Sequence, residues 1–327
     1  MEGQAMWLTF FALPLIGQAA AAAGWCYTSQ SASCGPEFWK TFSHNCGGEN
    51  QSPVNIDRAK ISKDKSLGDI VFGGYDQAPP GKWRIMNDGH TVLVSLDGDN
   101  TPAPIDISGA GLPNVYRALQ FHFHWGSLKQ DGSEHYIDGK QYPMELHIVH
   151  LSAKYKSIAD AKADPNGLAV LGLLFRVTPT DNANYNTIVD AMKNVTLEGE
   201  SVDLASTFRL DSLLPSADKL SRYYRYQGSL TTPDCAEAVI WTVFEEPVNI
   251  SRSQLNVFVD SVHFTATGEE RKKMTNNFRP PQPLRNRKIS ASRDATANRG
   301  TMRGTSLPAL LLTFLIGQHM VHAHRLS

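Results

Sequence analysis

Two short segments of the chain alternate polar and apolar side chains in the way that a half-buried β-strand does. Residues 120–126 read QFHFHWG, and residues 145–150 read ELHIVH. Both segments are rich in aromatic and β-branched residues, which favours strands over helices. We therefore predict a β-strand at each position.

The polar positions of these two strands carry histidines. Residues two apart on a strand point to the same face, so His122 and His124 share one face. If the two strands pair, His147 joins them, and three neutral imidazoles with an open fourth position are the ligand set of a catalytic zinc site. Gln120 and Glu145 lie two residues before His122 and His147, where each is placed to hold its histidine in the required tautomer. An ordinary polar sheet face is the alternative, which the third histidine and the two supporting groups disfavour.

The same pattern recurs along the chain and sets the fold class. No linker rich in Pro, Gly or Ser interrupts residues 25–285, and we find no internal repeat, so we expect one domain that is mainly β, or α+β. Strand-like runs lie at residues 91–96, 119–125, 144–150, 169–177 and 238–244, and helix-like segments at residues 157–163, 188–195 and 251–259.

The two ends of the 327-residue chain have the composition of targeting segments. An apolar run at residues 8–17 precedes small residues, which predicts a signal peptide over residues 1–23. The apolar run at residues 307–317 is too short to span a bilayer, which takes about 20 residues. Small residues and a polar spacer precede it, so residues 289–327 resemble a glycosylphosphatidylinositol (GPI) signal. A soluble secreted enzyme with a partly apolar tail is the alternative.

Ordered motifs across the chain carry a family resemblance. They are QSPVNI (51–56), QFHFHWG (120–126), GSEH (132–135), ELH (145–147), GLAVLG (167–172), SLTTP (229–233), VIW (239–241) and NFRPPQPL (277–284). Together they resemble the α-class carbonic anhydrases, and most closely the extracellular GPI-anchored members. The resemblance implies a domain over residues 24–288, built on a large central twisted mixed β-sheet with short peripheral helices.

The resemblance also implies an activity. The family catalyses the reversible hydration of CO2 to bicarbonate and a proton, through a hydroxide on one Zn2+ per chain. Glu134 and Thr231 match the family's gatekeeper pair, and Thr231 and Thr232 match the contacts to bicarbonate and to anionic or sulfonamide inhibitors. The apolar wall for CO2 would be formed by Val149, Val170, Leu230, Val239 and Trp241. The alternatives are a non-catalytic carbonic-anhydrase-like binding domain and a zinc hydrolase that acts mainly on esters.

His90 matches the position of the family's proton shuttle. A histidine suits this role because it titrates in the range that such a shuttle needs. Asp88 lies two residues before it, and a nearby carboxylate favours the imidazolium, so we expect a raised pKa for His90. Tyr27 matches a position that orders water in the active-site cone. Asn277 matches a residue that supports the metal ligands.

The cysteines and the net charge indicate the cellular environment of the chain and the kinds of partner it has. Cys26, Cys34, Cys46 and Cys235 allow three disulfide pairings, and the closeness of Cys26 and Cys34 suggests a local loop. The pair Cys46–Cys235 resembles the disulfide of the membrane-linked members of the family. A formal net charge of -1 gives no sign of nucleic-acid binding. We expect a cell-surface protein held by a GPI anchor, with bicarbonate transporters as candidate partners and with glycosylation sequons at Asn50, Asn194 and Asn249.

Overall fold

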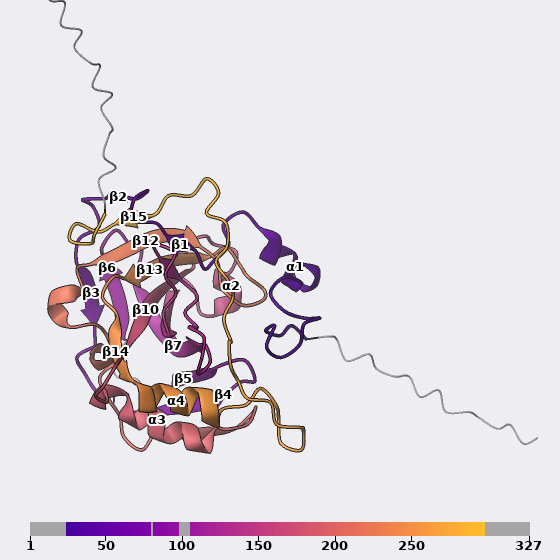
Figure 1. Ribbon diagram of the computed structural model, residues 1–327. Coiled ribbons are helices and arrows are strands. Elements are labelled where there is room, and N and C mark those ends of the chain that lie inside the picture. The colour runs from indigo at the N-terminus through magenta and orange to yellow at the C-terminus, as the bar shows by residue number, and fades with distance from the viewer. Residues whose placement is uncertain (1–23, 80, 98–104, 298–327) are drawn as a thin grey trace, which may run out of the picture.

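A mixed β-sheet of thirteen strands organises the chain in the computed structural model, which describes residues 24–79, 81–97 and 105–297 (Figure 1). β14 pairs with β10, and β6 pairs with both β3 and β7, beside the main path of the sheet. Along that path the strands are β11 (Ser201–Asp203), β4 (Lys82–Asn87), β5 (Val92–Asp97), β7 (Tyr116–Trp125), β9 (Met144–Ser152), β10 (Leu168–Thr178), β13 (Val239–Phe244), β12 (Tyr223–Gly228), β15 (Ser290–Ala291) and β2 (Ser62–Lys63), and the three beside it are β3 (Ile70–Gly73), β6 (Asp106–Gly109) and β14 (Val248–Ser251).

The remaining elements of the described chain are short. β1 (Asn55–Ile56) and β8 (Tyr136–Ile137) form a separate parallel pair. The α-helices are α1 (Trp39–Phe42), α2 (Ile158–Ala161), α3 (Asn186–Ala191) and α4 (Arg252–Ser261), and the 3-10 turns are η1 (His44–Gly47), η2 (Ala183–Tyr185), η3 (Met192–Asn194), η4 (Leu210–Leu213) and η5 (Ala217–Lys219). The predicted fold class, a large mixed sheet with short peripheral helices, is confirmed.

The strand pattern explains which face of the sheet is covered. Phe121, Phe123 and Trp125 of β7 are buried in one apolar cluster. The ring of Phe258 on α4 packs 5.1 Å from that of Phe123 and 5.5 Å from that of Trp125. α3 and α4 lie together on this side of the molecule (Figure 1). The alternate residues of β7, including the histidines, are thereby turned to the opposite face.

α4 is the longest helix among the described residues, and its start is fixed locally. The side chain of Ser251 accepts a hydrogen bond from the backbone of Gln254, whose own side chain accepts one from the backbone of Ser251. This capping box satisfies two amide groups that the first turn leaves without intrahelical partners. The helix then begins at Arg252, within two residues of the predicted position.

The chain continues to pack beyond residue 288. β15 pairs with β12 and β2, and Ala291 and Ala295 are buried. Residues 289–297, which we expected to belong to a spacer, therefore pack on the sheet through backbone hydrogen bonds and small apolar side chains. The predicted signal peptide and the apolar run at residues 307–317 lie outside the described residues. Within the described ranges, no helix has the length and hydropathy needed to cross a bilayer.

Candidate active site

β7 and β9 are antiparallel neighbours, and their register brings the predicted histidines together. His122 lies opposite His147, and His124 lies opposite Glu145. One ring nitrogen from each of His122, His124 and His147 lies within 4.8 Å of the others. The strand alternation read from the sequence therefore leads to one cluster of three imidazoles.

Each of the three rings is oriented by a hydrogen bond on its other nitrogen. His122 Nδ1 lies 2.9 Å from Gln120 Oε1, and His147 Nε2 lies 2.8 Å from Glu145 Oε1. His124 Nδ1 donates instead to the backbone carbonyl of Asn277, at 2.8 Å. These contacts leave His122 Nε2, His124 Nε2 and His147 Nδ1 facing one another.

The remaining nitrogens fit a tetrahedral zinc ion. His124 Nε2 and His147 Nδ1 are 3.1 Å apart. Two nitrogens bound tetrahedrally to one zinc at 2.0–2.1 Å lie about 3.3 Å apart. Burial lowers the pKa of His122 well below its ordinary value, and it lowers the pKa of His124 to about 4. The imidazoles are therefore neutral near pH 7, as metal ligation requires.

A second group of possible ligands, His135, Glu145 and His147, lies beside the first. Glu145 accepts hydrogen bonds from the backbone N–H groups of Glu134 and His135, at 2.8 and 2.7 Å. It also accepts from the rings of His135 and His147, at 2.7 and 2.8 Å. His135 Nε2 in turn lies 2.7 Å from the hydroxyl of Tyr226. This group is a hydrogen-bonded support for His147, because its donors and acceptors are already paired.

His135 and Tyr226 were not predicted as site residues. His135 directly follows Glu134 in the GSEH motif, which was the available signal. Tyr226 comes from β12, and only the three-dimensional packing brings its hydroxyl to His135.

Glu134 and Thr231 come from loops that lie beside the histidines. Glu134 is fully buried, and its Oε1 accepts a hydrogen bond of 2.7 Å from the backbone N–H of Arg279. Burial raises its pKa to about 7, against a lowering by the nearby His147 and, more weakly, by the Thr231 side chain. Glu134 Oε2 has no partner with good hydrogen-bond geometry. Thr231 is buried as well, and its side chain acts on the Glu134 carboxylate, so an acceptor and a hydroxyl group share a site away from solvent.

The predicted apolar wall lies on the metal side of the sheet. Val149, Val170 and Trp241 are aligned across β9, β10 and β13, and all three are buried. The Trp241 ring centroid is 4.7 Å from that of His147. Val239 is buried in the same apolar cluster, and Leu230 packs against it. These side chains thus form a continuous apolar surface that reaches a metal ligand.

His90 lies in the turn between β4 and β5. Its ring stacks on Trp25, with centroids 3.8 Å apart and an interplanar angle of 14°. The edge of Tyr27 approaches from a second direction, at 6.4 Å. Asp88 Oδ1 accepts hydrogen bonds from the backbone N–H groups of His90 and Thr91, at 2.9 and 2.8 Å, which fixes the turn.

The predicted direction of the His90 pKa shift was wrong. Burial lowers the pKa of His90, and this effect exceeds the opposing one from the Asp88 carboxylate. The sequence showed the neighbouring carboxylate but not the contact with Trp25, whose ring covers one face of the His90 ring and shields that face from water.

Replacing Asp88 with Asn tests the electrostatic part of this balance. The amide retains an oxygen for the two backbone N–H groups but removes the charge that favours the imidazolium. We expect the pKa of His90 to fall further, so the pH profile of the buffer-independent hydration rate should move toward acid. An unchanged profile would show that His90 does not control this rate or does not sense Asp88.

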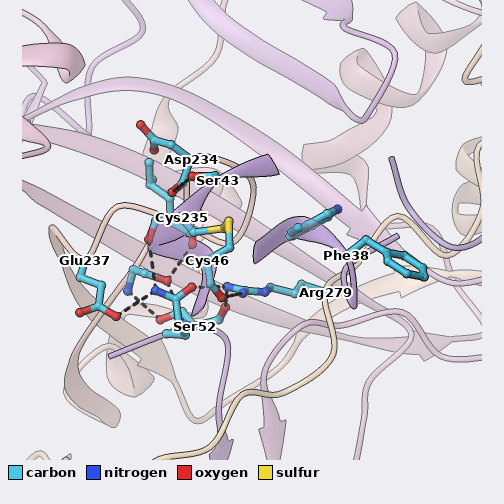
Figure 2. The surroundings of a disulfide bond; sticks show 12 residues. Phe38, Ser43, Cys46, Ser52, Asp234, Cys235, Glu237 and Arg279 are labelled. Atoms are coloured by element: carbon cyan, nitrogen blue, oxygen red, sulfur yellow. Dashed lines mark hydrogen bonds between the residues drawn. A yellow bond between two sulfur atoms is a disulfide. The ribbon is translucent and has the colours of Figure 1, made fainter. Parts of the chain in front are cut away.

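The four cysteines form two disulfides, Cys26–Cys34 and Cys46–Cys235. The second joins the segment after α1 to the loop that carries Thr231 (Figure 2). Arg279 is fully buried beside it, and its guanidinium donates to the carbonyls of Cys46 and Ser52, at 3.0 and 2.9 Å. The segment containing Cys46, the Thr231 loop and the segment containing Arg279 are therefore held together.

Known proteins are similar in sequence to nearly the whole chain. The profile of the eukaryotic-type carbonic anhydrase family matches residues 34–293. The chain belongs to this family. It is 46% identical over 311 residues to carbonic anhydrase 15 of Mus musculus, with 94% of each chain covered. It is 38% identical over 312 residues to carbonic anhydrase 4 of Oryctolagus cuniculus, covering 93% of this chain and 96% of the relative.

Family membership identifies the chain as an enzyme of the carbonic anhydrase type, a lyase, and it supports CO2 hydration in general terms. A human relative, carbonic anhydrase 7, is 39% identical over 271 residues, covering 82% of this chain and 97% of the relative. The family's dependence on zinc agrees with the three histidines.

The three sequons differ in their surroundings. Asn50 is half-buried, and its side-chain amide donates to Glu237 Oε2 at 3.0 Å. Asn194 and Asn249 are exposed, although Asn249 Oδ1 accepts a hydrogen bond from Arg176. A glycan would meet the fewest existing contacts at Asn194.

Proposed function

We propose that this enzyme catalyses the zinc-dependent, reversible hydration of CO2 to bicarbonate and a proton. The observation that carries the proposal is the convergence of one ring nitrogen from each of His122, His124 and His147, while the other nitrogen of each ring is held by a hydrogen bond. A Zn2+ ion on three neutral imidazoles lowers the pKa of a water in its fourth position to about 7, the value known for carbonic anhydrases, and so supplies a nucleophile at neutral pH.

Glu134 and Thr231 orient the oxygen that attacks CO2. Glu134 Oε1 accepts a hydrogen bond from the backbone N–H of Arg279, so Oε2 remains to accept a hydrogen bond from the Thr231 hydroxyl. Once the Thr231 hydroxyl donates its hydrogen to Glu134, the Thr231 oxygen can only accept a hydrogen bond from a group on the metal side. This directionality selects one orientation of the attacking oxygen.

The apolar wall of Val149, Val170 and Trp241 suits CO2, which offers no hydrogen-bond donor and little polarity. Val239 and Leu230 extend that wall, and Thr232 lies beside Thr231 as a polar contact for the bicarbonate product. The same two threonines would bind anions and sulfonamides that compete with bicarbonate.

His90 carries the proton between the site and the buffer. Tyr27 lies beside it, and Asn277 supports both ends of this region. The Asn277 side-chain amide donates to the His90 carbonyl at 3.1 Å, while its backbone carbonyl accepts from His124.

The enzyme acts at the outer cell surface, held by a GPI anchor near its C-terminus. Two disulfides support an oxidising compartment. Treating intact expressing cells with phosphatidylinositol-specific phospholipase C should release the protein into the medium. Protein that is already in the medium before treatment would instead indicate the soluble secreted form.

The activity is tested by stopped-flow CO2 hydration on the purified, secreted protein, with zinc measured on the same sample. We expect fast hydration with about one zinc per chain. A folded, zinc-loaded but inactive protein would overturn the proposal in favour of a binding domain. A hydrolysis rate on an activated aryl ester that exceeds CO2 hydration would do so in favour of a hydrolase.

A further inference from the structure

The loop that carries the two threonines of the site is held at Asp234, two residues after Thr232. Lys162 Nζ donates a hydrogen bond to Asp234 Oδ2 at 3.0 Å and forms an ion pair with it. The hydroxyl of Ser43 donates to the backbone carbonyl of Asp234, also at 3.0 Å (Figure 2). Asp234 is therefore fixed through its side chain by one distant segment and through its backbone by another.

Lys162 extends from a firmly packed part of the chain. It directly follows α2, whose start is capped by the side chain of Ser157. Ala161 is fully buried, and a Cβ atom added at Gly167 would lie only 2.0 Å from the Ala161 carbonyl oxygen. This close approach leaves the end of α2 no room to shift against the chain that enters β10. Lys162 thus stands on the connection between the strand that carries a metal ligand and a strand of the apolar wall.

The Asp234 carboxylate has no other cation to pair with. Among the residues that the structure describes, Lys162 is the only one whose positive group lies within 4.0 Å of this carboxylate. The two side chains are 33% and 40% exposed, so the pair is partly shielded from water. The second carboxylate oxygen, Oδ1, is enclosed and makes no hydrogen bond. Without Lys162 the charge of Asp234 would be stabilised best by moving toward solvent, and the loop would move with it.

A shift of this segment reaches Thr232 before it reaches Thr231. The backbone N–H of Cys235 donates to the Thr232 carbonyl at 2.8 Å, which closes a turn over residues 232–235. The Thr231 end of the loop is held separately, because the carbonyl of Ser229 accepts a hydrogen bond from an indole N–H at 3.0 Å. The turn is therefore the part of the loop whose position depends on the ion pair.

We propose that Lys162 is a positioning residue for bicarbonate, because its ion pair with Asp234 sets the position of Thr232. The proposal rests on the proposed function, which makes Thr232 a contact of the bicarbonate product. Lys162 acts through Asp234 and does not touch the substrate. Since the transition state already contains the new bond of bicarbonate, a displaced Thr232 weakens binding of both species by a similar factor.

Loss of the ion pair should appear in KM and not in kcat. In zinc-loaded protein we expect Lys162→Ala to raise the KM for bicarbonate dehydration about threefold, within the range of a partly exposed ion pair. The kcat for dehydration should stay within about 1.5-fold, as when binding of the ground state and of the transition state is lost equally. The value of kcat/KM for CO2 hydration should fall by the same threefold factor, because the overall equilibrium fixes the ratio of the two directions.

Restoring the charges should restore the KM. Lys162→Arg keeps the positive charge, and the reversed pair, Lys162→Asp with Asp234→Lys, exchanges the two charges, so both proteins should resemble the parent. Lys193→Ala is the matched control, because it removes a lysine that pairs with Asp190 at 3.6 Å on the surface beside α3. A bicarbonate KM that is unchanged in Lys162→Ala, or that is as high in the reversed pair as in Lys162→Ala, would overturn the proposal.

Hydrogen exchange tests the positioning without turnover. Asp234–Cys235 is the one Asp–Cys pair of the sequence, so labelling with 13C-carbonyl aspartate and 15N-cysteine identifies the Cys235 amide by NMR. This amide closes the turn, and we expect its exchange to be about threefold faster in Lys162→Ala and unchanged in Lys162→Arg. The amides of Cys26 and Cys34, which form the other disulfide, are internal controls.

The two readouts separate the positioning from the proposed function. An unchanged exchange rate of the Cys235 amide in Lys162→Ala would refute the positioning. Faster exchange with an unchanged bicarbonate KM would overturn the link between Lys162 and bicarbonate. Faster exchange in a chain whose zinc-loaded parent form does not hydrate CO2 would leave the positioning of the turn intact, and only the proposed function would fail.

Discussion

Replacing His122 with alanine is expected to remove bound zinc and to lower CO2 hydration by at least about 10⁴-fold. His122 supplies one of the three nitrogens that converge between β7 and β9. Two imidazoles and solvent cannot hold the ion in the same geometry, and a zinc site with three protein ligands is the minimum that keeps a single open position.

The measurement pairs metal content with rate. Zinc per chain is determined by plasma emission spectroscopy after dialysis, and hydration is followed by stopped flow on the same sample. His44→Ala is the matched control, because His44 is an exposed histidine on η1. Near-full zinc content in His122→Ala would point to the neighbouring group of His135, Glu145 and His147 as the true metal site.

The ligand set could be predicted from the sequence because strand geometry is local. Alternation in QFHFHWG and ELHIVH places each histidine on a face without knowledge of the rest of the fold. The pairing of the two strands was the one further assumption, and the register of His122 with His147 satisfies it. The five strand-like runs and three helix-like segments predicted from the same periodicity coincide with observed strands and helical segments, with boundaries that differ by a few residues.

The surroundings of the site could not be predicted in this way, because they depend on contacts between distant segments. The carbonyl that orients His124 belongs to Asn277, 153 positions along the chain. Trp25 reaches His90 only because the N-terminal loop folds over the β4–β5 turn, and this contact reverses the predicted pKa shift. A local sequence motif does not indicate that a distant segment will bury a side chain.

Removing the Cys46–Cys235 disulfide, by changing both cysteines to serine, is expected to lower the free energy of unfolding by about 5 kcal/mol. The bond joins residues 189 apart, so its loss releases a long loop in the unfolded chain. For a domain of this size, the melting temperature should fall by roughly 10–20 °C. Cys26→Ser with Cys34→Ser is the matched control, since a separation of 8 residues predicts a loss of only about 2.5 kcal/mol.

The same change should leave the activity of the folded enzyme nearly unchanged, because other contacts position the loop that carries Thr231. Trp241 Nε1 donates to the carbonyl of Ser229 at 3.0 Å, and the backbone N–H of Ser52 donates to Ser229 Oγ at 2.9 Å. We therefore expect kcat/KM per folded molecule to change little at low temperature, because two buried hydrogen bonds, each worth about 1 kcal/mol, remain to hold the loop. Urea unfolding in non-reducing buffer measures the stability, and stopped flow measures the rate. A large loss of kcat/KM in fully folded protein would mean that the disulfide itself holds Thr231 in its working position.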